Sequence, residues 1–245
     1  PLVAPSEMSR SLSGKKLQLL TNAYTNINGE KYDGGFKIKY VRDSQGKDLN
    51  YTIVNTMMRI DLDSPMSTGD KYTFNINWSY EINDRMKMDE RGGYEYFPDD
   101  KNFSYTIAQF FPRMAVYDDK EGWQNKQFLG RGEFALAFGD YELNITVPAD
   151  FIVAATGSLQ NPKEVLNKDE LARLELAKKT YDKPVLITTQ EEAIKKEKNP
   201  VKNKTKTWKF KAEMVRDVAF AASRKYIWDA MAVKLENKTP LAMSY

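Results

Sequence analysis

Alternation of apolar and polar residues is the feature that most constrains the fold of this chain. Every second residue of FNINWSYEI, at positions 74–82, is apolar. The same period of two recurs in FKIKY (36–40), YELNITV (141–147) and TWKFKAEM (207–214). Successive side chains of a β-strand point to opposite faces, so each segment predicts a strand with one apolar and one polar face. We expect Tyr40 to share the apolar face of the first strand, and Met214 that of the last.

Residues that tolerate positive φ separate these strands, among them Gly46, Gly69 and Gly157. Short strands joined by tight turns are typical of antiparallel sheets with one face in water. The sequence therefore predicts a mostly β fold, either an antiparallel sandwich or a large curved sheet.

Residues 162–198 differ, because this segment is rich in Lys, Glu and Leu. Asn167 is a candidate N-cap of one helix, and Thr189 with Glu192 has the spacing of a capping box for a second helix. The intervening PVLIT predicts a short strand. We interpret this segment as a short helical insertion on the β scaffold, with a solvated charged face as its simplest role.

Composition excludes several kinds of chemistry. The 245 residues include no Cys and no His, so thiolate and imidazole metal sites and Ser-His or Cys-His nucleophiles are absent. The net charge of +3 gives no overall attraction to nucleic acid. No apolar run reaches the ~20 residues of a transmembrane helix. We therefore predict no nucleic-acid partner and no transmembrane segment. We also predict no catalytic or metal-binding residue in this chain.

Acidic pairs and aromatic residues each allow two interpretations. The pairs at 61/63, 99/100 and 118/119 suit either calcium or glycosidase chemistry or, more simply, turns. Nine aromatic residues between Tyr94 and Trp123 form either a core or an exposed platform. We expect most of them in the core, with the aromatic residues of GGYEYFPDD (92–100) as an exception exposed in a loop.

The stretch YTIAQFFPRMAVYDDKEGW (105–123) combines a strand, a Pro-marked bend and an acidic turn. Gln109 lies among apolar residues, so its amide needs a hydrogen-bond partner, either the backbone at a corner or a ligand. Arg113 is placed to pair with a carboxylate such as Asp118 or Asp119. From the residues alone, a structural corner and a ligand contact both stay open.

Three segments in this order resemble the N-terminal domain of aminopeptidase N-like zinc metallopeptidases, the gluzincin aminopeptidases, in their bacterial branch. They are IAQFFPRMAVYDDKEGW (107–123), FGDYELNITVPADFIVAATGSLQNP (138–162) and TWKFKAEMVRDVAFAASRKYIWDAM (207–231). The resemblance implies a saddle-like β domain that abuts a thermolysin-like catalytic domain. It implies that residues 1–225 form this domain, with the helical insertion at about 162–198, and that 226–245 form a final strand leading toward a catalytic domain absent from this chain.

The same resemblance implies roles for single residues. Gln109 would contact the α-amino group of the peptide substrate, and Arg113, Asp118 and Asp119 would support that loop. The zinc motif H-E-x-x-H cannot occur in a chain without His, and the G-x-M-E-N motif is absent too. We therefore expect no cofactor in this chain, with zinc in the catalytic domain of a parent hydrolase that performs proteolysis. The bacterial branch implies a periplasmic or other extracytoplasmic location.

Two alternatives stay open. One is a β-sandwich module that binds a glycan or a protein through the loop from Tyr94 to Phe97. The other is a structural domain of an inactive peptidase-like protein that has lost its zinc motif.

Overall fold

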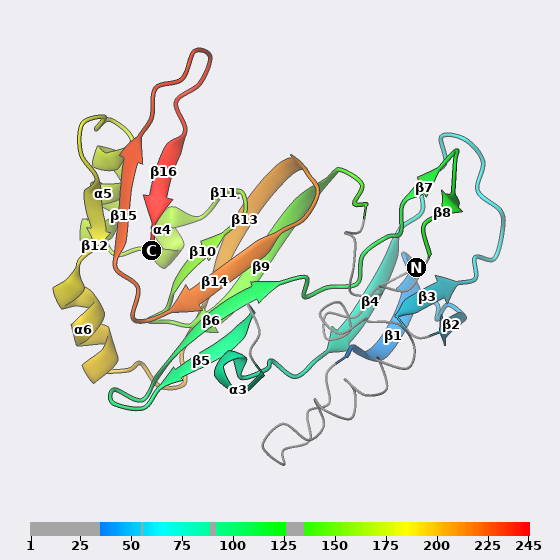
Figure 1. Ribbon diagram of the computed structural model, residues 1–245, viewed down its shortest axis with the longest axis horizontal. Coiled ribbons are helices and arrows are strands. Elements are labelled where there is room, and N and C mark those ends of the chain that lie inside the picture. Colours follow the sequence, from blue (N-terminus) through cyan, green and yellow to red (C-terminus); the bar gives the residue numbers. More distant parts are fainter. Residues whose placement is uncertain (1–34, 55, 89–91, 126–134) are drawn as a thin grey trace. The chain divides into compact units, whose positions relative to one another are not determined.

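The computed structural model describes residues 35–54, 56–88, 92–125 and 135–245 (Figure 1). The chain divides into two compact units, each taken here by itself. Unit 1 holds the described residues of Pro1–Glu90 and Gln109–Phe138, and unit 2 those of Arg91–Ala108 and Gly139–Tyr245. All strand pairs among the described residues are antiparallel, and the helices are few and short. The predicted mostly β, antiparallel fold class with a short helical insertion is therefore confirmed.

Unit 1 contains three two-stranded sheets and one short helix. The sheets are β1 (Lys37–Asp43) with β4 (Phe74–Ser79), β2 (Tyr51–Val54) with β3 (Met57–Ile60), and β7 (Tyr117–Asp118) with β8 (Gly122–Trp123); the helix is α3 (Arg85–Met88). The buried centre of unit 1 is a cluster of Val41, Leu49 and Met58, and apolar residues of β1, β3 and β4 pack against it. The alternation predicted for 74–79 is present, because Phe74, Ile76 and Trp78 of β4 are less exposed than the residues between them.

Tyr40 does not share the face of Ile38, which corrects our expectation for β1. A bulge between Ile38 and Tyr40 shifts the register, so that Ile38 lies opposite Trp78 while Tyr40 lies opposite Asn77. A bulge inserts one extra residue into one strand and turns the following side chains to the other face. Val41 consequently takes the buried position that we expected for Tyr40, and it is only 1% exposed.

Unit 2 contains a four-stranded sheet and two three-stranded sheets. In spatial order they are β10 (Ile152–Ala155), β14 (Ala219–Ser223), β6 (Asn102–Ala108), β5 (Gly93–Phe97); then β11 (Ser158–Leu159), β13 (Thr205–Val215), β9 (Gly139–Pro148); then β12 (Val185–Thr188), β15 (Trp228–Ala232), β16 (Leu241–Ser244).

The pair of β9 and β13 shows the predicted alternation most clearly. Trp208 lies opposite Ile145 and Phe210 opposite Leu143, and all four side chains are buried. Met214 breaks the pattern, because a register shift follows Ala212 and Met214 has a φ of +52°. It is 70% exposed, so its predicted place on the apolar face is wrong.

Gly157 makes the predicted turn between β10 and β11. Its φ is +98°, and a Cβ placed there would lie 2.4 Å from the carbonyl oxygen of Lys211 on β13. Only glycine fits both the conformation and this close approach of two backbones.

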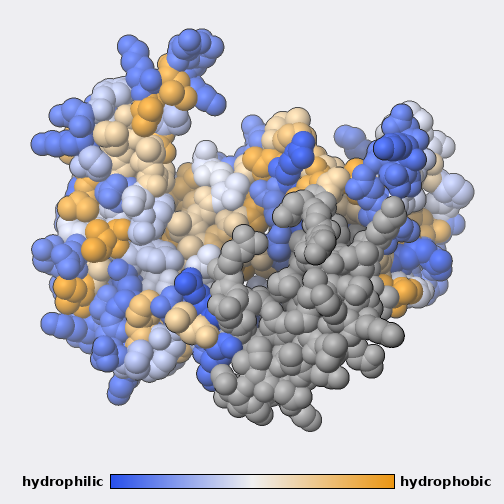
Figure 2. Space-filling model, in the orientation of Figure 1, coloured by the Kyte–Doolittle hydropathy of each residue, from blue (hydrophilic) through white to orange (hydrophobic). Residues whose placement is uncertain are grey.

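The helical insertion forms as predicted, with α4 (Pro162–Val165), α5 (Lys168–Ala177), β12 and α6 (Gln190–Lys198). Asn167 and Thr189 are the N-caps of α5 and α6, and both helices have a complete capping box. Hydrophilic residues predominate on this part of the surface, as the face in Figure 2 shows. The interior of the insertion packs on β12 and β15 through Leu174, Ala177 and Ile187.

The C-terminal residues 226–245 contain two strands, whereas we expected one. β15 pairs with β12 of the insertion on one side and with β16 on the other. Tyr245 stacks on Trp228 at a ring distance of 5.3 Å. The helical insertion and the C-terminal hairpin therefore share one sheet.

Candidate functional site

Gln109 follows the last residue of β6, where Ala108 pairs with Ala219. Its φ of +53° is in the left-handed region, which costs a non-glycine residue free energy and occurs often at functional sites. Gln109 is half-buried, and its amide makes no hydrogen bond within the described part of the chain. The sequence left open either a backbone partner or a ligand for this amide. The described structure supplies no backbone partner.

The bend after Gln109 is held by Trp78 of β4. The indole Nε1–H of Trp78 donates a hydrogen bond of 3.2 Å to the carbonyl oxygen of Phe110. The Phe110 and Phe111 rings meet edge to face at 5.2 Å. The hydrogen bond ties the backbone next to Gln109 to β4.

Arg113 is buried, with 8% of its surface exposed. The expected ion pair with Asp118 or Asp119 is absent from the described structure, because the contacts of Asp118 are made within its own turn and Asp119 is exposed without a contact. Arg113 therefore makes its contacts with groups other than these two carboxylates.

Asp118 organises the hairpin of β7 and β8. Its carboxylate accepts hydrogen bonds from the backbone N–H groups of Lys120 at 3.1 Å and Glu121 at 2.7 Å, and from the Gln124 side chain. The bonds from Glu121 and Gln124 keep the pKa of Asp118 below its usual value. Asp118 is thus a turn residue, as the simpler interpretation of the acidic pairs suggests.

Three residues of the other acidic pairs form ion pairs. Asp61 pairs with Arg59 at 3.0 Å, Asp63 with Lys47 at 2.5 Å, and Asp100 with Lys225. No group of three or more acidic side chains suited to a metal ion occurs among the residues that the structure describes.

Tyr94 and Tyr96 belong to strand β5, whereas we expected a loop. They lie opposite Tyr105 and Phe103 of β6, so the four rings share one face of the sheet. The rings of Tyr96 and Phe103 are 4.8 Å apart, and Tyr96 is 42% exposed. Phe97 lies on the opposite face, where the Lys225 ammonium lies 5.0 Å from its ring centre.

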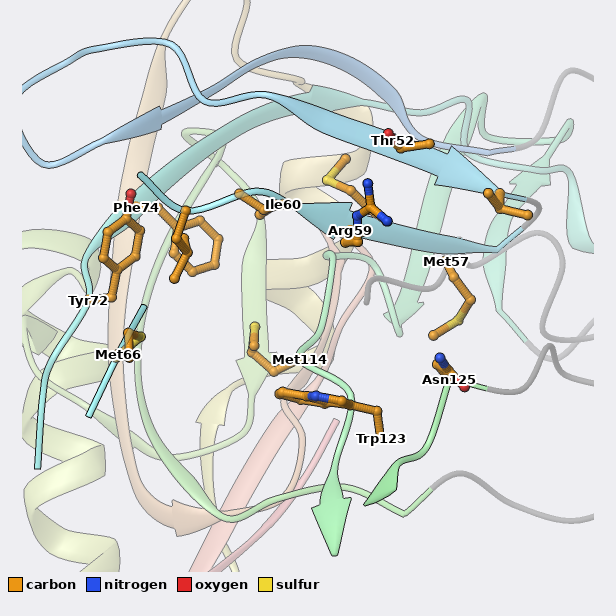
Figure 3. A pocket seen from close by; sticks show the side chains of 13 residues that line it. Thr52, Met57, Arg59, Ile60, Met66, Tyr72, Phe74, Met114, Trp123 and Asn125 are labelled. Carbon is orange, nitrogen blue, oxygen red and sulfur yellow. The ribbon is translucent and has the colours of Figure 1, made fainter. Parts of the chain in front are cut away.

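An apolar groove in unit 1 was missed by the sequence reasoning. Its volume is about 950 Å³, and it lies between the β2–β3 hairpin and the segment from Met114 to Asn125 (Figure 3). Methionine and aromatic side chains line most of it, including Met57, Met66, Met114, Tyr72, Phe74 and Trp123. The cluster of methionines at 57, 58 and 66 was the one sequence signal, and alone it cannot be distinguished from core.

Lys206 is a partly buried amine of unit 2. Its Nζ donates a hydrogen bond of 2.8 Å to the carbonyl oxygen of Val165 and lies 4.9 Å from the ring centre of Trp208. Burial, with a smaller effect of Lys196, lowers the pKa of Lys206 to about 8. The hydrogen bond places this amine at the end of α4, in a structural role.

Comparison with protein-family profiles, with curated proteins and with solved structures found no match for this chain. None of the described helices has the length and apolar character needed to cross a membrane.

Proposed function

We propose that this chain is the non-catalytic N-terminal domain of an aminopeptidase-like zinc metallopeptidase, a hydrolase of the bacterial branch with an extracytoplasmic location. It would form one wall of the peptide-binding cleft and dock on the catalytic domain of the parent protein. Zinc would belong to that catalytic domain. The proposal starts from the sequence resemblance, and one structural observation supports it.

That observation is the state of Gln109. A half-buried amide without a partner among the described residues, on a left-handed backbone that Trp78 anchors at the next residue, is suited to receive a ligand group. The α-amine of a peptide has a pKa near ~8, so at neutral pH it is mostly a cationic donor. The carbonyl oxygen of Gln109 can accept one of its hydrogens.

The test uses the parent protein and aminoacyl arylamides with a free α-amine. A hydrogen bond to a charged group contributes about 1.5–3 kcal/mol, so Gln109→Ala should raise KM about 10- to 100-fold with a smaller change in kcat. Gln45→Ala is the matched control, because Gln45 is exposed and its side chain makes no hydrogen bond within the described structure. An unchanged KM in Gln109→Ala would remove the proposed role.

Two further results bear on the whole proposal. The chain alone should not hydrolyse these substrates with zinc, and measurable hydrolysis would contradict it. A parent reading frame with a degenerate zinc motif would instead favour the structural domain of an inactive peptidase-like protein.

The exposed aromatic face of β5 and β6 favours a second candidate, a module that binds a glycan. Sugars stack on exposed aromatic rings, and Tyr96 is the most exposed of the four. Saturable glycan binding that Tyr96→Ala abolishes would support it. Retention of binding in that variant would exclude this face.

A further inference from the structure

The groove of unit 1 leaves several large apolar side chains exposed. Met114 is 55% exposed, Trp123 52% and Val54 62%, and all three line it. Contiguous exposed apolar patches of this kind mark interaction sites. Methionine side chains are flexible and polarizable, so a groove rich in them adapts to varied apolar partners.

The groove runs along an edge of β3 with which no strand of the described residues pairs, apart from β2 on the other side. The groove contacts all four residues of β3. Because successive residues of a strand point to opposite faces, the groove reaches the edge of β3 as well as one face. The Asp61 N–H donates to the carbonyl oxygen of Asn50, which makes these two residues a hydrogen-bonded pair. Hydrogen-bonded pairs alternate along an antiparallel ladder, so Arg59 and Met57 also bond toward β2.

The backbone groups of Met58 and Ile60 therefore point away from β2. No other strand of the described structure pairs with β3 on that side. These donors and acceptors lie next to the apolar groove and are available to a further strand. An added strand could continue the alternating ladder there.

One charged residue, Arg59, lines the groove within the described structure. Its Nε donates to Asp61 at 3.0 Å, and its two terminal nitrogens make no hydrogen bond in the described residues. A guanidinium binds a carboxylate through such paired N–H groups. Arg59 is cross-strand to Thr52 and on the same face as Met57 (Figure 3).

We propose that unit 1 binds an extended apolar peptide, which adds as a strand to the free edge of β3. The peptide carries an acidic residue beside Arg59 and an apolar residue two positions away beside Met57, because residues i and i+2 of a strand share a face. The main chain of the peptide supplies affinity, and these two side chains supply selectivity. This proposal is independent of the role of Gln109.

The probe is a short fluorescein-labelled peptide that alternates valine or isoleucine with threonine and carries one glutamate. Binding to the full chain is followed by fluorescence polarization and by the emission of Trp123. Trp208 and Trp228 are at most 2% exposed, and Trp78 is half-buried with its indole hydrogen-bonded to Phe110. Trp123 is the most exposed tryptophan of those described, so we expect it to dominate the blue shift on binding, and Trp123→Phe should remove that shift. Two analogues test whether the peptide pairs with the edge of β3. One carries N-methyl groups on the backbone nitrogens of the odd-numbered residues, and the other on those of the even-numbered residues.

Only one set of peptide N–H groups can face β3. We therefore expect N-methylation of one set to weaken binding at least tenfold and of the other set to change it little. Equal binding of both analogues would overturn the proposal. Arg59→Gln should weaken the glutamate peptide but not a peptide with glutamine in its place, and equal effects on both would overturn the charge pairing.

Met114→Glu places a charge in the groove and should abolish binding. Met86→Glu is the matched control, because Met86 is 67% exposed, belongs to unit 1 and does not line the groove. Circular dichroism checks that both variants fold. Sedimentation of the wild-type chain tests another occupant: a dimer that Met114→Glu dissociates would show that a second copy covers the groove, and would overturn the proposal.

Discussion

Gln109 combines a left-handed backbone with a half-buried side chain. The described non-glycine residues with positive φ are Lys101, Gln109, Asn203 and Met214. Lys101 lies in the turn before β6, Asn203 in a loop, and Met214 at a bulge, where such conformations are usual. Gln109 instead lies directly after a paired strand, and a glycine would fit there with less strain.

Gln109→Gly should therefore raise the free energy of unfolding by about 0.5–1 kcal/mol, since relief of the left-handed strain exceeds the entropy that glycine adds to the unfolded chain. Gln109→Val should lower it by about 1–2 kcal/mol, because a β-branched residue tolerates positive φ poorly. Urea unfolding measures both. Ala108→Gly, one residue earlier in a β conformation, is the control and should lower the free energy of unfolding. If Gln109→Gly lowers it too, the backbone at Gln109 is not strained.

Lys206 predicts a rise of stability with pH. Below pH 8 the amine is charged in both states, and its burial destabilises the folded chain. Between about pH 8 and the ordinary value of 10.5, the folded chain releases this proton while the unfolded chain keeps it, so stability increases with pH. Between pH 8 and 9.5 this amounts to a rise on the order of 1–2 kcal/mol.

Lys206→Met should flatten this rise, because methionine keeps the apolar length of the side chain and does not titrate. Lys209→Met, a change at a half-exposed amine of the same strand, should leave it intact. Urea unfolding at several pH values between 7.5 and 9.5 measures the slope. Burial also raises the pKa of Tyr226, whose effect begins only near pH 10. Equal slopes for wild type and Lys206→Met would contradict the prediction.

At the scale of elements, the helical caps were predictable because they depend on neighbouring residues. The Asn167 side chain accepts from the N–H groups of Asp169 and Glu170, each at 2.9 Å, as the sequence spacing indicates. Asn167→Ala should lower the free energy of unfolding by about 1 kcal/mol, since two N–H groups of α5 lose their acceptor. Lys168→Ala, at the next position, should change it by less than about 0.5 kcal/mol. A thermal or urea melt of both variants distinguishes a cap from a general effect of alanine.

The strand faces were predictable only up to the first bulge. Trp208 and Phe210 follow the sequence alternation, but Tyr40 and Met214 lie beyond register shifts that no local pattern marks. A bulge depends on what the partner strand and the core require, which is information from distant residues. The same limit hid the groove, because its walls come from segments far apart in the sequence.

At the scale of the whole chain, the structure has two separate cores. Unit 1 is centred on Val41, Leu49 and Met58, whereas unit 2 buries the long β9–β13 pair with Trp208. The resemblance implied one domain over residues 1–225, and it gave no sign of two cores. Which segments join which unit is set by long-range pairing, as in the return of β6 to pair with β14.

A matched pair of core variants tests whether these cores are independent. Met58 is 3% exposed and Leu143 8%, so truncation of either to alanine leaves a cavity and costs about 2–5 kcal/mol. Met58→Ala should speed amide hydrogen exchange in β1 and β4 while β9 and β13 keep their wild-type protection, and Leu143→Ala should do the reverse. Mass spectrometry of proteolytic fragments resolves these strands. If either variant accelerates exchange equally in all four strands, the two units unfold together, and a substitution in one core would change the stability of both.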